Sequence, residues 1–121
     1  MKYMVMMFGS AEEMAEVQEP AWIREMIAFM LGLNRELEES GELVEARGLT
    51  DGSQAKVVRR TDDGITVTDG PFAEAKESLV GYWVLDVADE ARIEEISGRI
   101  VQYSQVVEVR PVADAPPDLD S

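Results

Sequence analysis

The amino-acid sequence predicts an α+β fold built on an antiparallel sheet. Two segments, residues 2–8 and 80–87, are apolar on both faces, which is typical of buried strands. Two others, residues 20–40 and the stretch after Asp89, carry apolar residues at helical spacing. With the weaker strands between them, the order is strand–helix–strand, a hairpin, then strand–helix–strand. This order predicts the split β-α-β, or ferredoxin-like, arrangement with an inserted hairpin.

The first strand is expected over residues 2–8. Both of its faces are apolar, with Met4, Met6 and Phe8 on one and Tyr3, Val5 and Met7 on the other. A strand with one face in water would alternate apolar and polar residues, so we expect this strand to be covered on both sides. Gly9 and Ser10 end it, and residues 10–20 form a polar connection or a short helical turn.

The first long helix is expected to begin at Pro20 and to stop at Gly41. Proline suits the first helical turn, where its missing N–H costs little, and glycine suits the position just after a helix. One predicted buried stripe follows the helical spacing: Ile23, Met26, Ile27, Met30, Leu33 and Leu37. Phe29 and Leu31 add apolar surface around the back, more than one sheet face needs.

The remaining elements follow in order along the chain. Strands are predicted over residues 42–49, over residues 54–69 as a hairpin turning at residues 61–64, over residues 80–87 and over residues 106–112. Asp89 is a good N-cap for the second helix. Three isoleucines on one face of that helix predict its buried side, namely Ile93, Ile96 and Ile100.

The doubly apolar strands also predict an assembly. Two helices can cover only one face of the sheet, so a second copy of the chain is the economical cover for the other face. We therefore expect a homodimer through the sheet face. A single domain is expected over residues 1–112, followed by a flexible acidic, proline-rich tail over residues 113–121.

Composition excludes several classes of function. The chain has no cysteine and no histidine, which removes thiolate chemistry, the commonest metal ligands and the commonest general base near neutral pH. Its formal net charge of −14 argues against binding nucleic acid or anionic membranes. The first nine residues are too short for a signal peptide or a membrane span, so we expect a cytoplasmic protein. No phosphate-binding loop or metal-ligand spacing occurs, and we expect no cofactor and no metal.

The stretch "TDGPFAEAKE", residues 68–77, carries the strongest functional signal. Asp69 has two interpretations: a catalytic carboxylate at the mouth of a cleft, or a turn residue that accepts backbone N–H groups while Phe72 fills the core. Four further side chains are expected to bind a ligand or, alternatively, to be solvated or structural: Glu74, Lys76, Glu77 and Tyr82. A second cleft, lined by methionines and Phe29 between the first long helix and the sheet, could accept an apolar compound. The alternative is that these side chains form an ordinary core and dimer interface.

Four segments together resemble the YCII-related family: "MKYMVMMFG", "GELVEARGL", "VTDGPFAEAKESLVGYWVLDV" and "VEVRPV". The closest resemblance is to the subgroup with the motif Asp69-Gly70-Pro71-Phe72. It implies a dimeric α+β barrel of ferredoxin-like protomers. Some members of the family carry a His-Asp pair in a cleft and were proposed to be enzymes, and one branch is a dehydrochlorinase. This chain has no histidine, and "SGRIVQYSQ" lacks the matching Asp-Pro, so that pair does not carry over.

Two hypotheses for function therefore stand. The first is a small-molecule binding protein, with its cleft near residues 69–77, that acts as a cofactor-independent enzyme or as a binder. The second is a non-catalytic regulatory or interaction module, because members of this subgroup resemble proteins encoded beside extracytoplasmic-function sigma factors.

Overall fold

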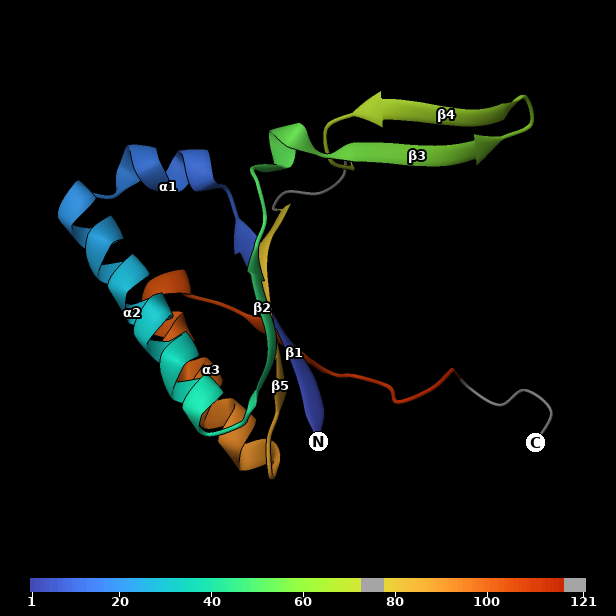
Figure 1. Ribbon diagram of the computed structural model, residues 1–121. Coiled ribbons are helices and arrows are strands. Elements are labelled where there is room, and N and C mark those ends of the chain that lie inside the picture. Colours follow the sequence, from blue (N-terminus) through green and yellow to red (C-terminus); the bar gives the residue numbers. More distant parts are fainter. Residues whose placement is uncertain (73–77, 117–121) are drawn as a thin grey trace.

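The computed structural model describes residues 1–72 and 78–116, and it has the predicted α+β, ferredoxin-like architecture (Figure 1). The elements are β1 (Lys2–Gly9), α1 (Ala11–Val17), α2 (Pro20–Glu39), β2 (Leu43–Gly48), the 3-10 turn η1 (Gly52–Gln54), β3 (Lys56–Thr61), β4 (Gly64–Asp69), β5 (Ser78–Asp86), α3 (Glu90–Ser104) and β6 (Glu108–Pro111). One antiparallel sheet has the order β2-β5-β1-β6, and β3 pairs with β4 in a separate hairpin.

The helices α2 and α3 cover one face of the sheet, and the β3–β4 hairpin extends from one end of the sheet on the side away from them (Figure 1). The core lies between these helices and the sheet. Its buried side chains are Tyr3, Val5, Leu33, Leu37, Trp83, Leu85, Val87, Ile93, Ile96 and Ile100. Each large side chain removed from water here stabilises the fold by about 1.5–3 kcal/mol. The predicted buried face of α3 is thus confirmed.

The helix α2 begins at Pro20 and ends before Gly41, whose φ of +81° is typical of the residue after a helix. Its predicted stripe is right at Leu33 and Leu37 but wrong at Ile27, which is 48% exposed. Ile27 and Leu31 lie four residues apart on one line of the helix that no described element covers. Phe29 instead packs on the ring of Tyr103 in α3, with the ring centroids 4.8 Å apart.

The face of the sheet opposite the helices carries the second set of apolar side chains. Met4 is paired with Val84 and Met6 with Tyr82 across the β1–β5 ladder, and all four are partly exposed. Strand alternation places these side chains away from α2 and α3, because their neighbours Val5 and Trp83 are buried beneath the helices. Within the described residues, no helix lies over this face (Figure 1).

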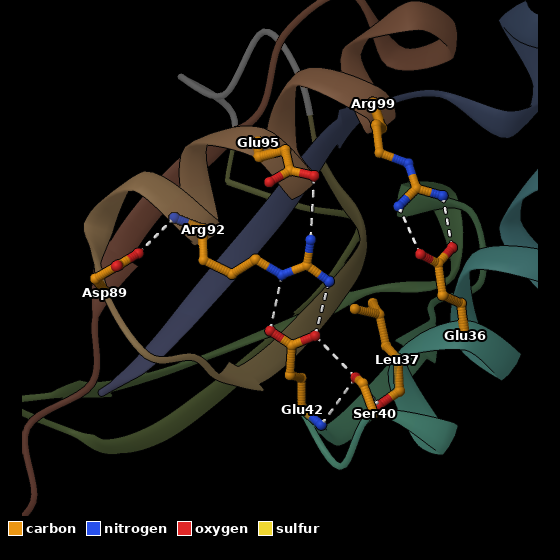
Figure 2. A network of polar contacts seen from close by, with 8 residues as sticks. All are labelled: Glu36, Leu37, Ser40, Glu42, Asp89, Arg92, Glu95 and Arg99. Carbon is orange, nitrogen blue, oxygen red and sulfur yellow. Dashed lines mark hydrogen bonds and ion pairs between the residues drawn. The ribbon is translucent and has the colours of Figure 1, made fainter.

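A network of charged side chains ties α3 to the turn between α2 and β2 (Figure 2). The Arg92 guanidinium donates to both carboxylate oxygens of Glu42, with N–O distances of 2.9 and 2.8 Å, and to Glu95 at 3.2 Å. The Ser40 hydroxyl also donates to Glu42, at 2.8 Å. These hydrogen bonds, above all those from Arg92, lower the pKa of the Glu42 carboxyl to about 2, although its partial burial opposes the shift.

A second pair joins α3 to the last turn of α2, two helical turns along α3 from Arg92 (Figure 2). Arg99 donates to both oxygens of Glu36, at 3.1 and 2.7 Å. This pair is more exposed than the Arg92–Glu42 pair, since its side chains are 36% and 50% accessible. Water and salt screen it more strongly, so it contributes less to the stability of the fold.

We expect Glu42→Gln to lower the free energy of unfolding by about 1.5–3 kcal/mol at pH 7, because it removes hydrogen bonds between charged groups. The pKa of Glu42 falls from 4.5 to about 2 on folding. Its contribution is therefore fully present above pH 4.5 and is lost as the pH falls toward 2. Urea unfolding at pH 7 and at low pH measures both effects.

Glu36→Gln is the matched control, because it removes the more exposed of the two pairs and should have a smaller effect. The stabilising role of the ionised Glu42 carboxylate would be contradicted if the stability difference between the wild type and Glu42→Gln stayed constant from pH 7 to pH 2.

Candidate functional site

A cavity of about 460 Å³ lies beside the Asp69-Gly70-Pro71-Phe72 turn, where β2 leads through η1 into the hairpin. We call it the loop cavity. Its walls are largely apolar, with a few polar groups, and they comprise Leu49, Thr50, Asp51, Gly52, Ala55, Lys56, Val57, Pro71, Phe72, Ser78 and Leu79. The cavity falls within the range of small-molecule pockets, about 300–1,000 Å³.

Backbone hydrogen bonds and one close contact fix these walls. The N–H of Leu49 donates to the carbonyl of Val80 at 2.8 Å, and the N–H of Gly70 donates to the carbonyl of Ala55 at 2.7 Å. Gly52 lies so near the start of β5 that an added Cβ would stand 2.5 Å from the Ser78 Oγ. Glycine at position 52 is therefore what allows η1 to approach β5 this closely.

Phe72 lies at the wall of the loop cavity and is 57% exposed. The interpretation in which Phe72 fills the core is therefore wrong. The guanidinium group of Arg59, on β3 of the hairpin, lies 5.5 Å from the centroid of the Phe72 ring and makes a cation–π contact with it. The turn directs this side chain outward, because Gly70 adopts a φ of +91° and Pro71 follows it with a fixed φ.

Asp69 stands at the base of the hairpin, directly opposite Lys56 in the β3–β4 ladder. Its Oδ1 accepts a hydrogen bond from the Lys56 ammonium at 2.9 Å, and its side chain is 87% exposed. Lys56 lines the loop cavity, whereas Asp69 is absent from the lining. A catalytic role for Asp69 stays a prediction.

The other predicted ligand-binding residues are placed as follows. Glu74, Lys76 and Glu77 lie outside the described residues. Tyr82 is on β5, paired with Met6 and Arg47. Alternation directs its ring away from the helices, while the residue is also among those that line a second cavity, between α2 and the sheet. The structure therefore does not bring Asp69 and Tyr82 together.

A second cavity, of about 320 Å³, lies between α2 and the sheet. We call it the methionine cavity. Four methionines line it, Met7, Met14, Met26 and Met30, and Trp83 and Asn34 border it. This is the methionine cleft that the sequence indicated, but Phe29 is not part of it. Asn34 was not predicted from the sequence as a residue of this cavity. Its spacing was the available signal, because Asn34 lies four residues after Met30 and eight after Met26 and is therefore a polar residue on the same apolar side of the helix.

Residues 1–72 and 78–116 contain neither a metal-binding cluster nor a membrane-spanning helix. No group of three or more Asp and Glu side chains is arranged to hold a metal ion. No helix is long and apolar enough to cross a membrane.

Comparison with known proteins decides the family. A model described as the YCII-related domain matches residues 1–115. The chain belongs to the YCII-related family. A relative from Rhizobium meliloti (strain 1021), described as an uncharacterized protein, is 34% identical over 77 residues. That match covers 59% of this YCII-related chain and 62% of the relative, which is less than two thirds of the relative's length.

We expect Gly52→Ala to lower the free energy of unfolding by about 1–3 kcal/mol, because its methyl group would overlap the Ser78 hydroxyl. Thermal unfolding monitored by circular dichroism measures the loss. Adding Ser78→Gly should recover part of it, since that change removes the overlapping atoms.

Gly48→Ala is the control, because an added Cβ at position 48 meets nothing within 4 Å. A Gly52→Ala variant as stable as Gly48→Ala would show that η1 and β5 can separate at no cost.

Proposed function

We propose that this YCII-related protein binds a small molecule with an apolar body in the loop cavity. The observation that carries the proposal is the position of Phe72, at the wall of this cavity and more than half exposed. An aromatic ring left in water loses the free energy that burial would provide, and a ligand lying against it supplies that burial. Val57 and Leu79 extend the apolar surface that such a ligand would contact.

The polar groups of the loop cavity suggest the other end of the ligand. Lys56 is 65% exposed and has Asp69 as its ion-pair partner, which is an arrangement of low stability in water. A carboxylate on the ligand can take the place of Asp69, with the Ser78 and Thr50 hydroxyls as further hydrogen-bond donors. We therefore propose small aromatic or alicyclic carboxylates as the ligand class.

The geometry supports binding better than catalysis. Asp69 faces solvent and Lys56, and it does not line the cavity in which a reacting group would sit. Cofactor-independent catalysis with Asp69 as the base remains a prediction, as do ligand contacts by Glu74, Lys76, Glu77 and Tyr82. We also propose, on the motif at residues 69–72, that the chain belongs to the Asp-Gly-Pro-Phe subgroup, and we propose that the protein is cytoplasmic.

Benzoate is a suitable probe of the loop cavity, because it combines a flat apolar ring with one carboxylate. We expect millimolar benzoate to raise the unfolding temperature of the wild type, since a ligand that binds only the folded state stabilises it. Phe72→Ala should abolish most of this rise by removing the ring contact. Differential scanning fluorimetry at about 0.15 M salt is the measurement.

Ile65→Ala is the control, because it removes another apolar side chain that is more than half exposed and lies far along the hairpin. It should keep the response of the wild type. An equal benzoate response in Phe72→Ala and the wild type would remove the main support for the proposal.

We further propose a homodimer in which two copies pack their uncovered sheet faces together as a dimeric α+β barrel. The support is the apolar strip of Met4, Met6, Tyr82 and Val84, whose side chains point away from the chain's own helices. Burying it against a second copy would cover the second face of β1 and β5.

A second candidate function is favoured by the β3–β4 hairpin. Val58, Ile65 and Val67 lie on one face of it and are 63%, 67% and 56% exposed. A group of exposed apolar side chains outside the sheet face suits a protein-interaction module. This is the surface that a regulatory role, with a sigma factor as a partner, would use.

We expect light scattering at micromolar concentration to report a dimer. Met6→Lys should convert it to a folded monomer, because a charge in the centre of the sheet face opposes pairing without disturbing the core under the helices. Ile65→Lys should leave the dimer intact.

A wild-type monomer would refute the dimer. Dissociation of the dimer by Ile65→Lys would show that the hairpin is part of the dimer interface. Its apolar face would then be unavailable to another protein, which would contradict the second candidate function.

A further inference from the structure

The methionine cavity is separate from the loop cavity and lies on the helix-covered side of the sheet. Its four methionines come from three elements, Met7 from β1, Met14 from α1, and Met26 and Met30 from α2, and residues of β2 and β5 complete the lining. Unbranched methionine side chains adapt their shape, so they suit a pocket that accepts an apolar molecule. Leu49 lines both cavities and marks the boundary between them.

One polar side chain gives this cavity chemical selectivity. The Trp83 indole N–H donates to Asn34 Oδ1 at 2.7 Å. An indole N–H can only donate, so the oxygen of the Asn34 amide must face Trp83 and its NH2 group must face elsewhere. Among the described residues, this NH2 group makes no hydrogen bond. Asn34 lines the cavity and is partly exposed, so its NH2 group is free to donate to a guest molecule.

The charges around the cavity exclude an ionic guest. Among the described residues, no Asp or Glu lines it, so a cation would find no partner there. Arg47, the one charged residue in the described lining, pairs with Tyr82 across the sheet, whereas its neighbour Ala46 pairs with Trp83. Alternation therefore directs the Arg47 side chain to the opposite face, away from the methionines. An anion would find no cation here either.

We propose that the methionine cavity binds a neutral, apolar small molecule that carries one carbonyl-type hydrogen-bond acceptor. The methionines and Trp83 contact its apolar body, and the Asn34 NH2 group donates to its oxygen. This site is independent of the loop cavity, whose proposed ligands are carboxylates.

The methionines themselves provide the test. The chain has seven, of which Met7, Met14, Met26 and Met30 line the cavity and Met1, Met4 and Met6 do not. Titration of methyl-¹³C-methionine protein with acetophenone, followed by NMR, should shift the first four methyl signals and leave the other three unchanged. α-Methylstyrene has the same shape without the acceptor, and it should bind about fivefold more weakly, as expected for one lost neutral hydrogen bond.

Four variants test the site further. Asn34→Asp keeps an acceptor for Trp83 but removes the donor, so it should lose the preference for acetophenone. Met26→Trp should fill the cavity and abolish the shifts, while Leu31→Trp, exposed on the same helix, should not. Phe72→Ala should also leave the shifts unchanged, which separates this site from the loop cavity.

Shifts confined to Met1, Met4 and Met6, or no shift at all, would overturn the site. Equal affinity for acetophenone and α-methylstyrene in the wild type would overturn the role of Asn34. An acetophenone preference that survives in Asn34→Asp would do the same.

Discussion

The pairing of β1 with β5 is the interaction on which the rest of the structure depends. Val5 and Trp83 face each other across this pair, and both are buried beneath the helices. The N-terminal ammonium group closes one end of the ladder by donating to the Asp86 carboxylate and the Val87 carbonyl, both at 2.9 Å. β2 and β6 attach only to the outer edges of this pair, and α2 and α3 rest on its inner face. Both proposed cavities include residues of β5 in their walls.

Apolar burial holds the helices on the sheet but does not by itself fix their angle or height, because it has no direction. The two bidentate arginine–glutamate pairs supply that direction. Each joins α3 to the end of α2 or to the turn that follows it, and each needs a planar match between guanidinium and carboxylate. Their main contribution is thus to select one arrangement of the two helices over its neighbours.

The sequence predicted the fold well where one physical signal dominated. Pro20, Gly41 and Asp89 set helix ends by local backbone chemistry, and the apolar strands could only be central. Prediction was wrong where a side chain had two acceptable environments. Ile27 fits the helical stripe, yet it lies outside the part of α2 that packs against the sheet and α3. Phe72 follows a turn whose direction depends on a positive φ at Gly70. The role of Asn34 depends on a partner 49 residues away, which spacing along one helix does not reveal.

The order of the strands has a consequence for the synthesis of the chain. β1 leaves the ribosome before its two partners, because 68 residues separate Gly9, the end of β1, from Ser78, the start of β5, and β6 lies further on. Meanwhile β1 has unpaired backbone groups and apolar side chains on both faces, which is the kind of segment that associates with other chains. α2 is completed much earlier and can form locally. The nascent protein thus has its longest helix in place well before its central strand is paired, and this interval is when it is most exposed to chaperones and to aggregation.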